Sequence, residues 1–237
     1  MKTSFSLAHL TVLGLAPPEM IAVASRTGYQ TVGLRLIQVT ETTPGYRLMD
    51  DKPMMRATKS ATAATGIEVL DIEFVKITPE IKVASLEPFL AAGAELGAKY
   101  VITSPYDPDL ARLADRLAAI SDLASQYRLR ALLEFFPWTV IPDLGAALRI
   151  VEAAKRPELG ILVDTLHFNR SNSSTTFPPA VCPLCTCATP RCRTAIRRRS
   201  FCTLGVRNGF PLAKATLISK LSCDTCPRVS LWRWKCR

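Results

Sequence analysis

The chain has 237 residues, with 30 lysines and arginines, 20 acidic residues and 48% hydrophobic residues. This length suffices for one barrel or for one to two ordinary domains, and the apolar content suffices for a large core. No uncharged apolar run reaches 18 residues, which excludes a transmembrane helix, and no membrane partner is expected.

The net charge of +10 is unevenly distributed along the chain. Residues 1–170 carry 18 basic and 19 acidic side chains, whereas residues 171–237 carry 12 basic side chains and a single acid, Asp224. All eight cysteines also lie in the second segment. The balanced first segment argues against nucleic-acid binding, which selects a basic surface. Its lack of cysteines indicates a cytoplasmic protein.

Residues 5–16 have the rough shape of a secretory signal, but two features argue against one. His9 interrupts the apolar run, and Pro17 and Pro18 stand where a small-residue cleavage site is needed. We therefore interpret the start of this segment as a buried first strand.

The first 170 residues alternate between short apolar segments and amphipathic segments that have helix-start and helix-stop residues. In chain order the pattern predicts a strand at 5–11, a helix at 17–28, a strand at 31–36, a helix at 52–65, a strand at 67–74, a helix at 78–97, a strand at 100–103, a helix at 107–127, a strand at 129–135, a helix at 142–154 and a strand at 159–163. The strands are apolar on both faces and recur about every 30 residues, as in parallel βαβ units.

Two architectures fit this alternation, a doubly wound open sheet and a (β/α)8 barrel. A single glycine, Gly14, follows the first strand, so the glycine-rich loop of a dinucleotide-binding sheet is missing. Polar side chains at the strand ends favour the barrel, because barrel enzymes carry their catalytic groups there. The expected fold class is therefore α/β, of the (β/α)8 TIM-barrel type.

The polar residues at the six strand ends are the candidate site. They are His9, Arg35, Glu73, Ser104, Glu134 and Asp164, and His167 follows shortly after the last of them. A site is one interpretation of this series, and ordinary caps or surface residues are the other.

Glu134 lies within an apolar run, where a carboxylate needs a partner or a metal. The alternative is a hydrogen-bonded core glutamate. Asp164 and His167 suit a divalent cation such as Mn, Mg, Co or Zn. The alternative for this pair is an aspartate that caps a helix, followed by a surface histidine.

Five segments resemble a known family: SLAHLT at 6–11, VGLR at 32–35, DIEF at 71–74, LEFFPW at 133–138 and LVDTLHF at 162–168. Together they resemble the sugar-phosphate isomerase/epimerase family, which has the xylose-isomerase-like TIM barrel. The resemblance covers residues 1–172. It implies a metal-dependent isomerase or epimerase that acts on a keto sugar or a related small polyol, with a sugar or sugar phosphate as partner. Whether the chain forms a homo-oligomer is left open.

The resemblance also implies roles for the strand-end residues. In the family a Glu, an Asp, a His and a Glu, which end strands five to eight, hold a divalent metal, so Glu134 and Asp164 are the expected metal ligands. Glu134, His167 and Glu73 are the candidate catalytic residues, with His167 placed near the substrate. The candidate substrate-binding residues are His9, Arg35 and Ser104.

The implied chemistry is polarisation of a carbonyl and a hydroxyl by the metal, with proton transfer by a carboxylate at the adjacent carbon. The family also contains dehydratases and abasic-site endonucleases, so the fold alone does not fix the reaction. An endonuclease on this barrel is disfavoured by the net charge of the first segment.

Residues 173–237 show no alternation of strand and helix. The spacing of Cys182 and Cys185, and of Cys223 and Cys226, is typical of zinc sites. An alternative function is therefore a zinc-stabilised binding protein whose basic tail contacts nucleic acid, with its tryptophans as stacking groups.

A constant shift of reading frame offers another explanation of the tail. Joining the last base of each codon to the first two of the next permits Pro-Phe-Val-His-Leu-Cys-Asp-Ala-Pro across residues 182–190, which resembles the continuation of the family. We therefore interpret residues 1–172 as an incomplete barrel of about six β/α units and residues 173–237 as an out-of-frame tail without a stable fold. Strands seven and eight would then be missing, the sixth strand would be an exposed edge, and activity would be impaired by the loss of two metal ligands.

Overall fold

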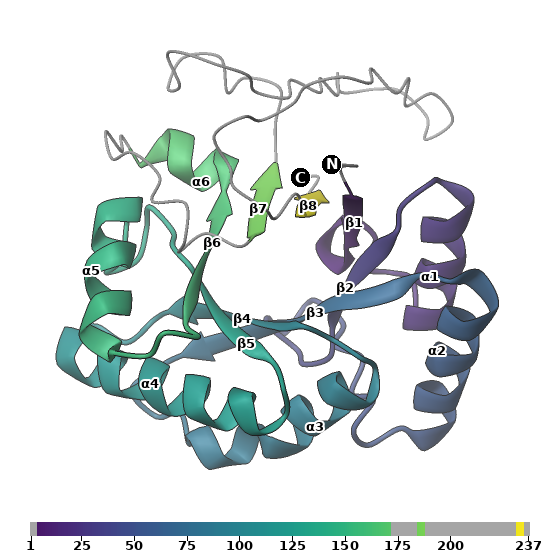
Figure 1. Cartoon of the computed structure of the whole chain (residues 1–237), viewed down its shortest axis with the longest axis horizontal. Coiled ribbons are helices and arrows are strands. Elements are labelled where there is room, and N and C mark those ends of the chain that lie inside the picture. The colour runs from purple at the N-terminus through teal and green to yellow at the C-terminus, as the bar shows by residue number, and fades with distance from the viewer. Residues whose placement is uncertain (1–3, 172–183, 188–230, 235–237) are drawn as a thin grey trace.

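The computed structural model describes residues 4–171, 184–187 and 231–234. Figure 1 shows the strands curled around a common centre, with helices α1 to α5 on the outside. The strands are β1 (Ser4–Ala8), β2 (Thr31–Arg35), β3 (Glu68–Ile77), β4 (Tyr100–Pro105), β5 (Arg130–Glu134), β6 (Gly160–Asp164), β7 (Leu184–Cys187) and β8 (Leu231–Trp234). The helices are α1 (Pro17–Arg26), α2 (Lys52–Thr65), α3 (Glu87–Glu95), α4 (Leu110–Gln126), α5 (Leu144–Ala154) and α6 (Thr165–Arg170), with 3-10 turns η1 (His9–Thr11) and η2 (Val83–Leu86).

Every strand is parallel to its neighbours, and the order of the strands around the barrel is their order in the chain. β8 pairs with β1, which closes the ring. Parallel neighbours require a crossover between them, and helices supply it between the first six strands. The predicted (β/α)8-type TIM barrel is confirmed.

The expectation that β6 is an exposed edge needs a correction. Val163 of β6 lies opposite Cys185 of β7, and Leu7 of β1 lies opposite Trp234 of β8. Four extended residues suffice for each pairing, because a parallel ladder is made by main-chain groups. The zinc pairs and the out-of-frame interpretation of residues 173–237 fall largely outside the described residues and stay predictions.

Most of the predicted elements have bounds that differ from the observed ones by one to three residues, and β3 continues to Ile77 where an end at 74 was expected. Two further differences are larger or bear on the site. The helix expected from residue 78 begins at Glu87, with Pro88 in its first turn, because η2 occupies the residues just before it. The first strand ends at Ala8 and turns into η1, so His9 lies just beyond the strand. The short helix α6 was not predicted at all.

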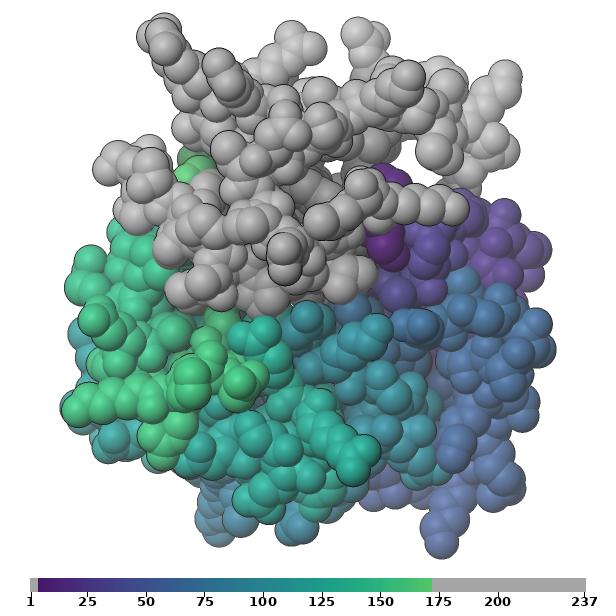
Figure 2. Space-filling view, in the orientation of Figure 1, coloured from purple at the N-terminus to yellow at the C-terminus, as the bar shows by residue number. Residues whose placement is uncertain are grey.

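Buried apolar side chains form two clusters on opposite faces of the strands. Side chains alternate between the faces of a strand, so Leu133 packs against the helices in the larger cluster while Leu132 belongs to the smaller one. The smaller cluster fills the barrel interior with Leu70, Phe74, Tyr100, Ile102, Leu132, Phe136 and Leu162. Glu134 and Asp164 each lie two residues after a member of this inner cluster, and this periodicity directs them into the barrel. Figure 2 shows the coloured segments packed closely against one another on the face turned to the viewer.

Gly33 of β2 stands opposite Asp71 of β3, next to an irregularity in the register of these strands. A Cβ atom at Gly33 would lie 2.6 Å from the nearer carboxylate oxygen of Asp71, well inside van der Waals contact. The side chain of Asp71 is fully buried. Glycine at this position therefore makes room for a buried carboxylate inside the barrel.

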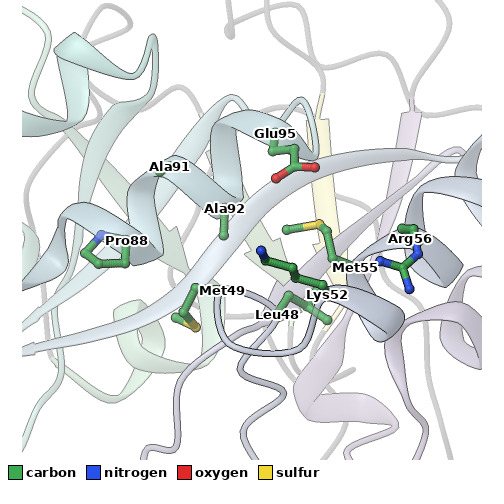
Figure 3. Close-up of a pocket in the computed structure, with 9 residues that line it drawn as sticks. All are labelled: Leu48, Met49, Lys52, Met55, Arg56, Pro88, Ala91, Ala92 and Glu95. Atoms are coloured by element: carbon green, nitrogen blue, oxygen red, sulfur yellow. The ribbon is translucent and has the colours of Figure 1, made fainter.

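A cavity of about 460 Å³ lies on the helical ring, away from the strand ends. Figure 3 shows it between α2 with the loop before it and α3. It is lined by Leu48, Met49, Lys52, Met55, Arg56, Pro88, Ala91, Ala92 and Glu95. Among the helices that the structure describes, none has both the length and the apolar character needed to cross a bilayer.

A buried carboxylate joins the end of β4 to α4 and to the loop after β3. Asp107 is fully buried and accepts hydrogen bonds from Arg112 at 2.8 and 2.7 Å and from Arg116 at 3.0 Å. Arg116 also donates to the carbonyl oxygens of Thr78 and Pro79. The hydrogen bond from Arg112 lowers the pKa of the Asp107 carboxyl below its ordinary value, against the opposing effect of burial.

Asp107→Asn should lower the free energy of unfolding by about 1 to 3 kcal/mol at pH 7, because it removes a charge that the two arginines bind. Since the pKa of Asp107 is lowered in the folded state, its contribution is fully present above the pKa of the unfolded chain. The contribution is lost as the pH falls below about 4. Urea denaturation at several pH values should therefore show the difference between the two proteins shrinking in acid. Asp50→Asn, which alters an exposed ion pair with Arg47, should change stability little at any pH.

Candidate metal centre

Three buried donor side chains meet where β5 and β6 end. Glu134 is the last residue of β5, Asp164 is the last residue of β6, and His167 lies in α6, which follows directly. One ligand atom from each of the three lies within 4.8 Å of the others. Their exposed fractions are 0%, 2% and 3%, so the cluster is shielded from solvent.

The two carboxylate oxygens of Asp164 make different contacts. Its Oδ1 atom accepts hydrogen bonds from the backbone N–H groups of Leu166 at 2.7 Å and His167 at 3.4 Å, which caps α6. Its Oδ2 atom lies 3.7 Å from Nε2 of His167. The alternative interpretation from the sequence was therefore right about the cap. It was wrong about the histidine, which is buried.

The ring of His167 is held by two aromatic side chains of the loop after β5. Phe136 meets it edge to face at 4.7 Å between ring centroids, and Trp138 does so at 5.1 Å. These two rings also stack on each other, with centroids 5.1 Å apart. The imidazole therefore has a fixed orientation beside the two carboxylates.

The donor set fits a divalent cation. Two carboxylates and an imidazole are ligands that Mn²⁺, Co²⁺ and Zn²⁺ share. Ligand atoms bound at about 2.1 Å to one ion lie within about 4.2 Å of each other. The observed limit of 4.8 Å therefore requires only a small adjustment for all three atoms to reach one ion.

Arg35 and Glu73 form a second buried group, Arg35 at the end of β2 and Glu73 within β3, which continues to Ile77. The two residues lie opposite each other in the sheet, and Nη2 of Arg35 is 3.7 Å from Oε1 of Glu73. Both side chains are buried, with exposed fractions of 7% and 0%. Each residue was predicted from its position at a strand end, and the structure pairs them.

His9 contacts main-chain atoms with both nitrogens of its ring. Its Nδ1 atom accepts a hydrogen bond from the backbone N–H of Arg35 at 3.0 Å, so its Nε2 atom carries the proton in the neutral ring and donates to the carbonyl oxygen of Leu15 at 2.9 Å. The ring also stacks on Tyr46 with centroids 5.0 Å apart. These contacts join the loop after β1 to the end of β2.

The structure thus gathers the predicted residues into groups. Glu134, Asp164 and His167 come together, whereas Ser104 is buried at the end of β4 and donates to the carbonyl oxygen of Val75 at 3.3 Å. The aromatic rings of Phe136 and Trp138 were not identified as part of a site. Their position directly after Glu134 was the available signal.

A comparison with protein families gives a match over most of the chain. The family model of the xylose isomerase-like TIM barrel matches residues 21–182. A comparison with curated proteins finds no significant match.

Several solved structures are similar in fold, at low sequence identity. The IolI protein with a bound zinc atom is 17% identical with a TM-score of 0.64, and the match covers 78% of this chain and 72% of that one. D-psicose 3-epimerase, determined in the presence of D-fructose, is 13% identical with a TM-score of 0.63, over 78% of this chain and 73% of that one. The 3-keto-D-glucoside 4-epimerase of E. coli is 16% identical with a TM-score of 0.61, over 79% of each chain.

The family model spans more than half of the chain, and the solved structures above are similar to it in fold. The chain therefore belongs to the family of xylose isomerase-like TIM barrels.

Proposed function

We propose that this chain is a metal-dependent isomerase or epimerase that acts on a keto sugar or a related small polyol. The observation that carries the proposal is the cluster of Glu134, Asp164 and His167 at the carboxyl ends of neighbouring barrel strands. This end of a TIM barrel is where catalytic groups gather. The structural neighbours with known reactions include two sugar epimerases, and one neighbour holds a zinc atom.

In the proposed site, His167 is a third ligand beside the two carboxylates. The family resemblance implied two ligands in this chain, Glu134 and Asp164, with His167 near the substrate, whereas the residue types alone had paired Asp164 with His167 as a possible cation site. Three protein ligands with an open position are typical of catalytic zinc sites. A cation held in this way would supply Lewis acidity toward a carbonyl or hydroxyl oxygen of the substrate. The impaired activity expected from two ligands alone is correspondingly less severe in this proposal.

In this proposal, side chains of the protein transfer the proton at the carbon next to the carbonyl. Glu134 is the candidate for taking a proton from the carbon next to the carbonyl, because it is a buried carboxylate beside the proposed substrate position. Glu73 is a second candidate, because it is a buried carboxylate whose Oε1 atom lies 3.7 Å from Nη2 of Arg35. Arg35 and Ser104 remain candidates for substrate binding. His9 acts indirectly in this proposal, by positioning the end of β2.

Proton exchange with solvent tests the proposal whichever product the reaction forms. The full chain is incubated in D2O with D-fructose and a small panel of other ketoses, and deuterium incorporation next to the carbonyl is followed by NMR. We expect incorporation with added Mn²⁺, and its loss on addition of a chelator, because proton removal needs a polarised carbonyl. The proposal would be contradicted if deuterium incorporation did not respond to the chelator. It would also be contradicted if no ketose of the panel incorporated deuterium with Mn²⁺ or another divalent cation.

A further inference from the structure

Lys76 lies near the end of β3, at the mouth of the barrel. Its ammonium group donates a hydrogen bond to the carbonyl oxygen of Val39 at 2.8 Å and lies 5.4 Å from the centroid of the Tyr106 ring. It faces an open hollow of about 530 Å³ that is lined by Gln38, Val39, Thr40, Glu41 and Lys76. Val39 also packs against the inner hydrophobic cluster, which places this hollow over the barrel interior.

A row of aromatic rings leads from Lys76 to the metal centre. Tyr106, on which the ammonium lies, has its ring centroid 6.5 Å from that of Phe136. Phe136 in turn contacts the ring of His167 at 4.7 Å and stacks on Trp138. We call Tyr106, Phe136 and Trp138 the aromatic wall. The two outer rings of the wall reach solvent, since Tyr106 is 37% and Trp138 is 53% exposed, whereas Phe136 between them is buried.

The contacts of Lys76 leave its charge available to a ligand. An ammonium group has three donors, and the carbonyl oxygen of Val39 accepts one hydrogen bond. A carbonyl dipole and an aromatic face orient the positive charge without neutralising it. Arg35, by contrast, lies beside the buried carboxylate of Glu73. Lysine is a common ligand of phosphate groups as a point charge, and it binds carboxylates in the same way.

We propose that the substrate carries a phosphate or carboxylate group that Lys76 binds, while its carbon skeleton lies along the aromatic wall and its oxygen-rich end lies at Glu134, Asp164 and His167. This inference rests on the function proposed above and adds the class of substrate, an anionic keto sugar rather than a neutral one. The C–H groups of a sugar skeleton suit an apolar aromatic surface, and the polar ends suit the cation and the metal centre.

Binding of three matched ligands tests this inference. D-fructose, D-fructose 6-phosphate and D-fructuronate differ in the group at one end, and their affinities for the full chain are measured by calorimetry with a chelator present. We expect at least one charged ligand to bind about tenfold or more tightly than D-fructose, because a charge-assisted contact with Lys76 is added. The two charged ligands distinguish a phosphate site from a carboxylate site.

Variants at Lys76 attribute the preference to this side chain. Lys76→Met keeps an apolar stem without the charge and should remove the preference for the charged ligand, whereas Lys76→Arg should retain most of it. Lys82→Met changes an exposed lysine of the loop before α3 and should retain it fully. If thermal denaturation shows that Lys76→Met is unfolded, Lys76→Gln replaces it in the comparison.

Three outcomes would overturn the inference. The unaltered chain could bind all three ligands equally, it could bind neither charged ligand measurably, or Lys76→Met could keep the preference for the charged ligand. Because the chelator is present, these outcomes do not depend on a bound metal ion. Metal-dependent proton exchange could therefore persist when the anion site fails. If instead the charged ligand is preferred but no metal-dependent proton exchange occurs, the proposed reaction is contradicted and the anion site is supported.

Discussion

Glu134→Gln should weaken the binding of Mn²⁺ to the full chain by at least about 100-fold, because a neutral amide replaces one of three ligands that lie within reach of a single ion. The expected magnitude is set by comparison with residues that only hydrogen-bond to metal ligands. Loss of such a supporting residue lowers metal affinity by about 10- to 100-fold, so loss of a ligand itself should cost at least as much. Mn²⁺ is the preferred probe because its oxygen and nitrogen preference separates this site from the cysteines of the tail. Free Mn²⁺ is measured by electron paramagnetic resonance.

Two further variants make this result specific. Asp164→Asn should lower the affinity similarly, and the asparagine can still cap α6, so that loss of the helix is not the cause. Glu68→Gln alters an exposed carboxylate that pairs with Lys99, and it should leave Mn²⁺ binding unchanged. Unaltered affinity in Glu134→Gln would show that the three side chains do not form the binding site.

Phe135→Ala should lower the free energy of unfolding by about 3 to 5 kcal/mol, the usual cost of deleting a buried aromatic ring. Phe135 follows β5 directly, is fully buried, and belongs to the cluster between the strands and the helices. Its neighbours in the chain, Glu134 and Phe136, point toward the barrel interior, so the variant tests the outer core alone. Urea denaturation followed by circular dichroism gives the free energy.

Leu110→Ala is the matched control for this experiment. Leu110 is 52% exposed at the start of α4, and its truncation should change the free energy of unfolding by no more than about 0.5 kcal/mol. A similarly small effect for Phe135→Ala would mean that the packing between β5 and the helices contributes much less than its burial indicates.

The fold of the first 170 residues was predictable because local signals agree there. Asp51 caps α2 through the N–H of Met54, and Gly66 ends the same helix with a φ of 72°, so the predicted bounds of 52–65 were correct. The start of α3 was not predictable in this way, because residues 78–80 resemble a helix start whereas the chain first makes η2. β7 and β8 were missed because four-residue strands have too few residues to show a periodicity.

The candidate site was predictable where a charged residue stands within or directly after an apolar strand. A carboxylate in the apolar run of β5 indicated Glu134, and an aspartate with a nearby histidine after the next apolar strand indicated Asp164. The sequence paired His167 with Asp164 as a possible cation site, but the approach of both residues to Glu134 depends on the position of α6 after β6. Lys76 lies beyond the strand that was expected at 67–74, and its position over Tyr106 depends on the β4–α4 loop.

The three donors come from one short stretch of the chain, which runs from Glu134 through α5 to His167. A bound ion would therefore tie together two consecutive strands and the helix after them, without help from the opposite half of the ring. Cross-linking so few intervening residues carries a small loop-closure cost. Metal binding would then stabilise α6 locally and reduce its fraying. The backbone amides of α6 should therefore exchange their hydrogens more slowly when the cation is present.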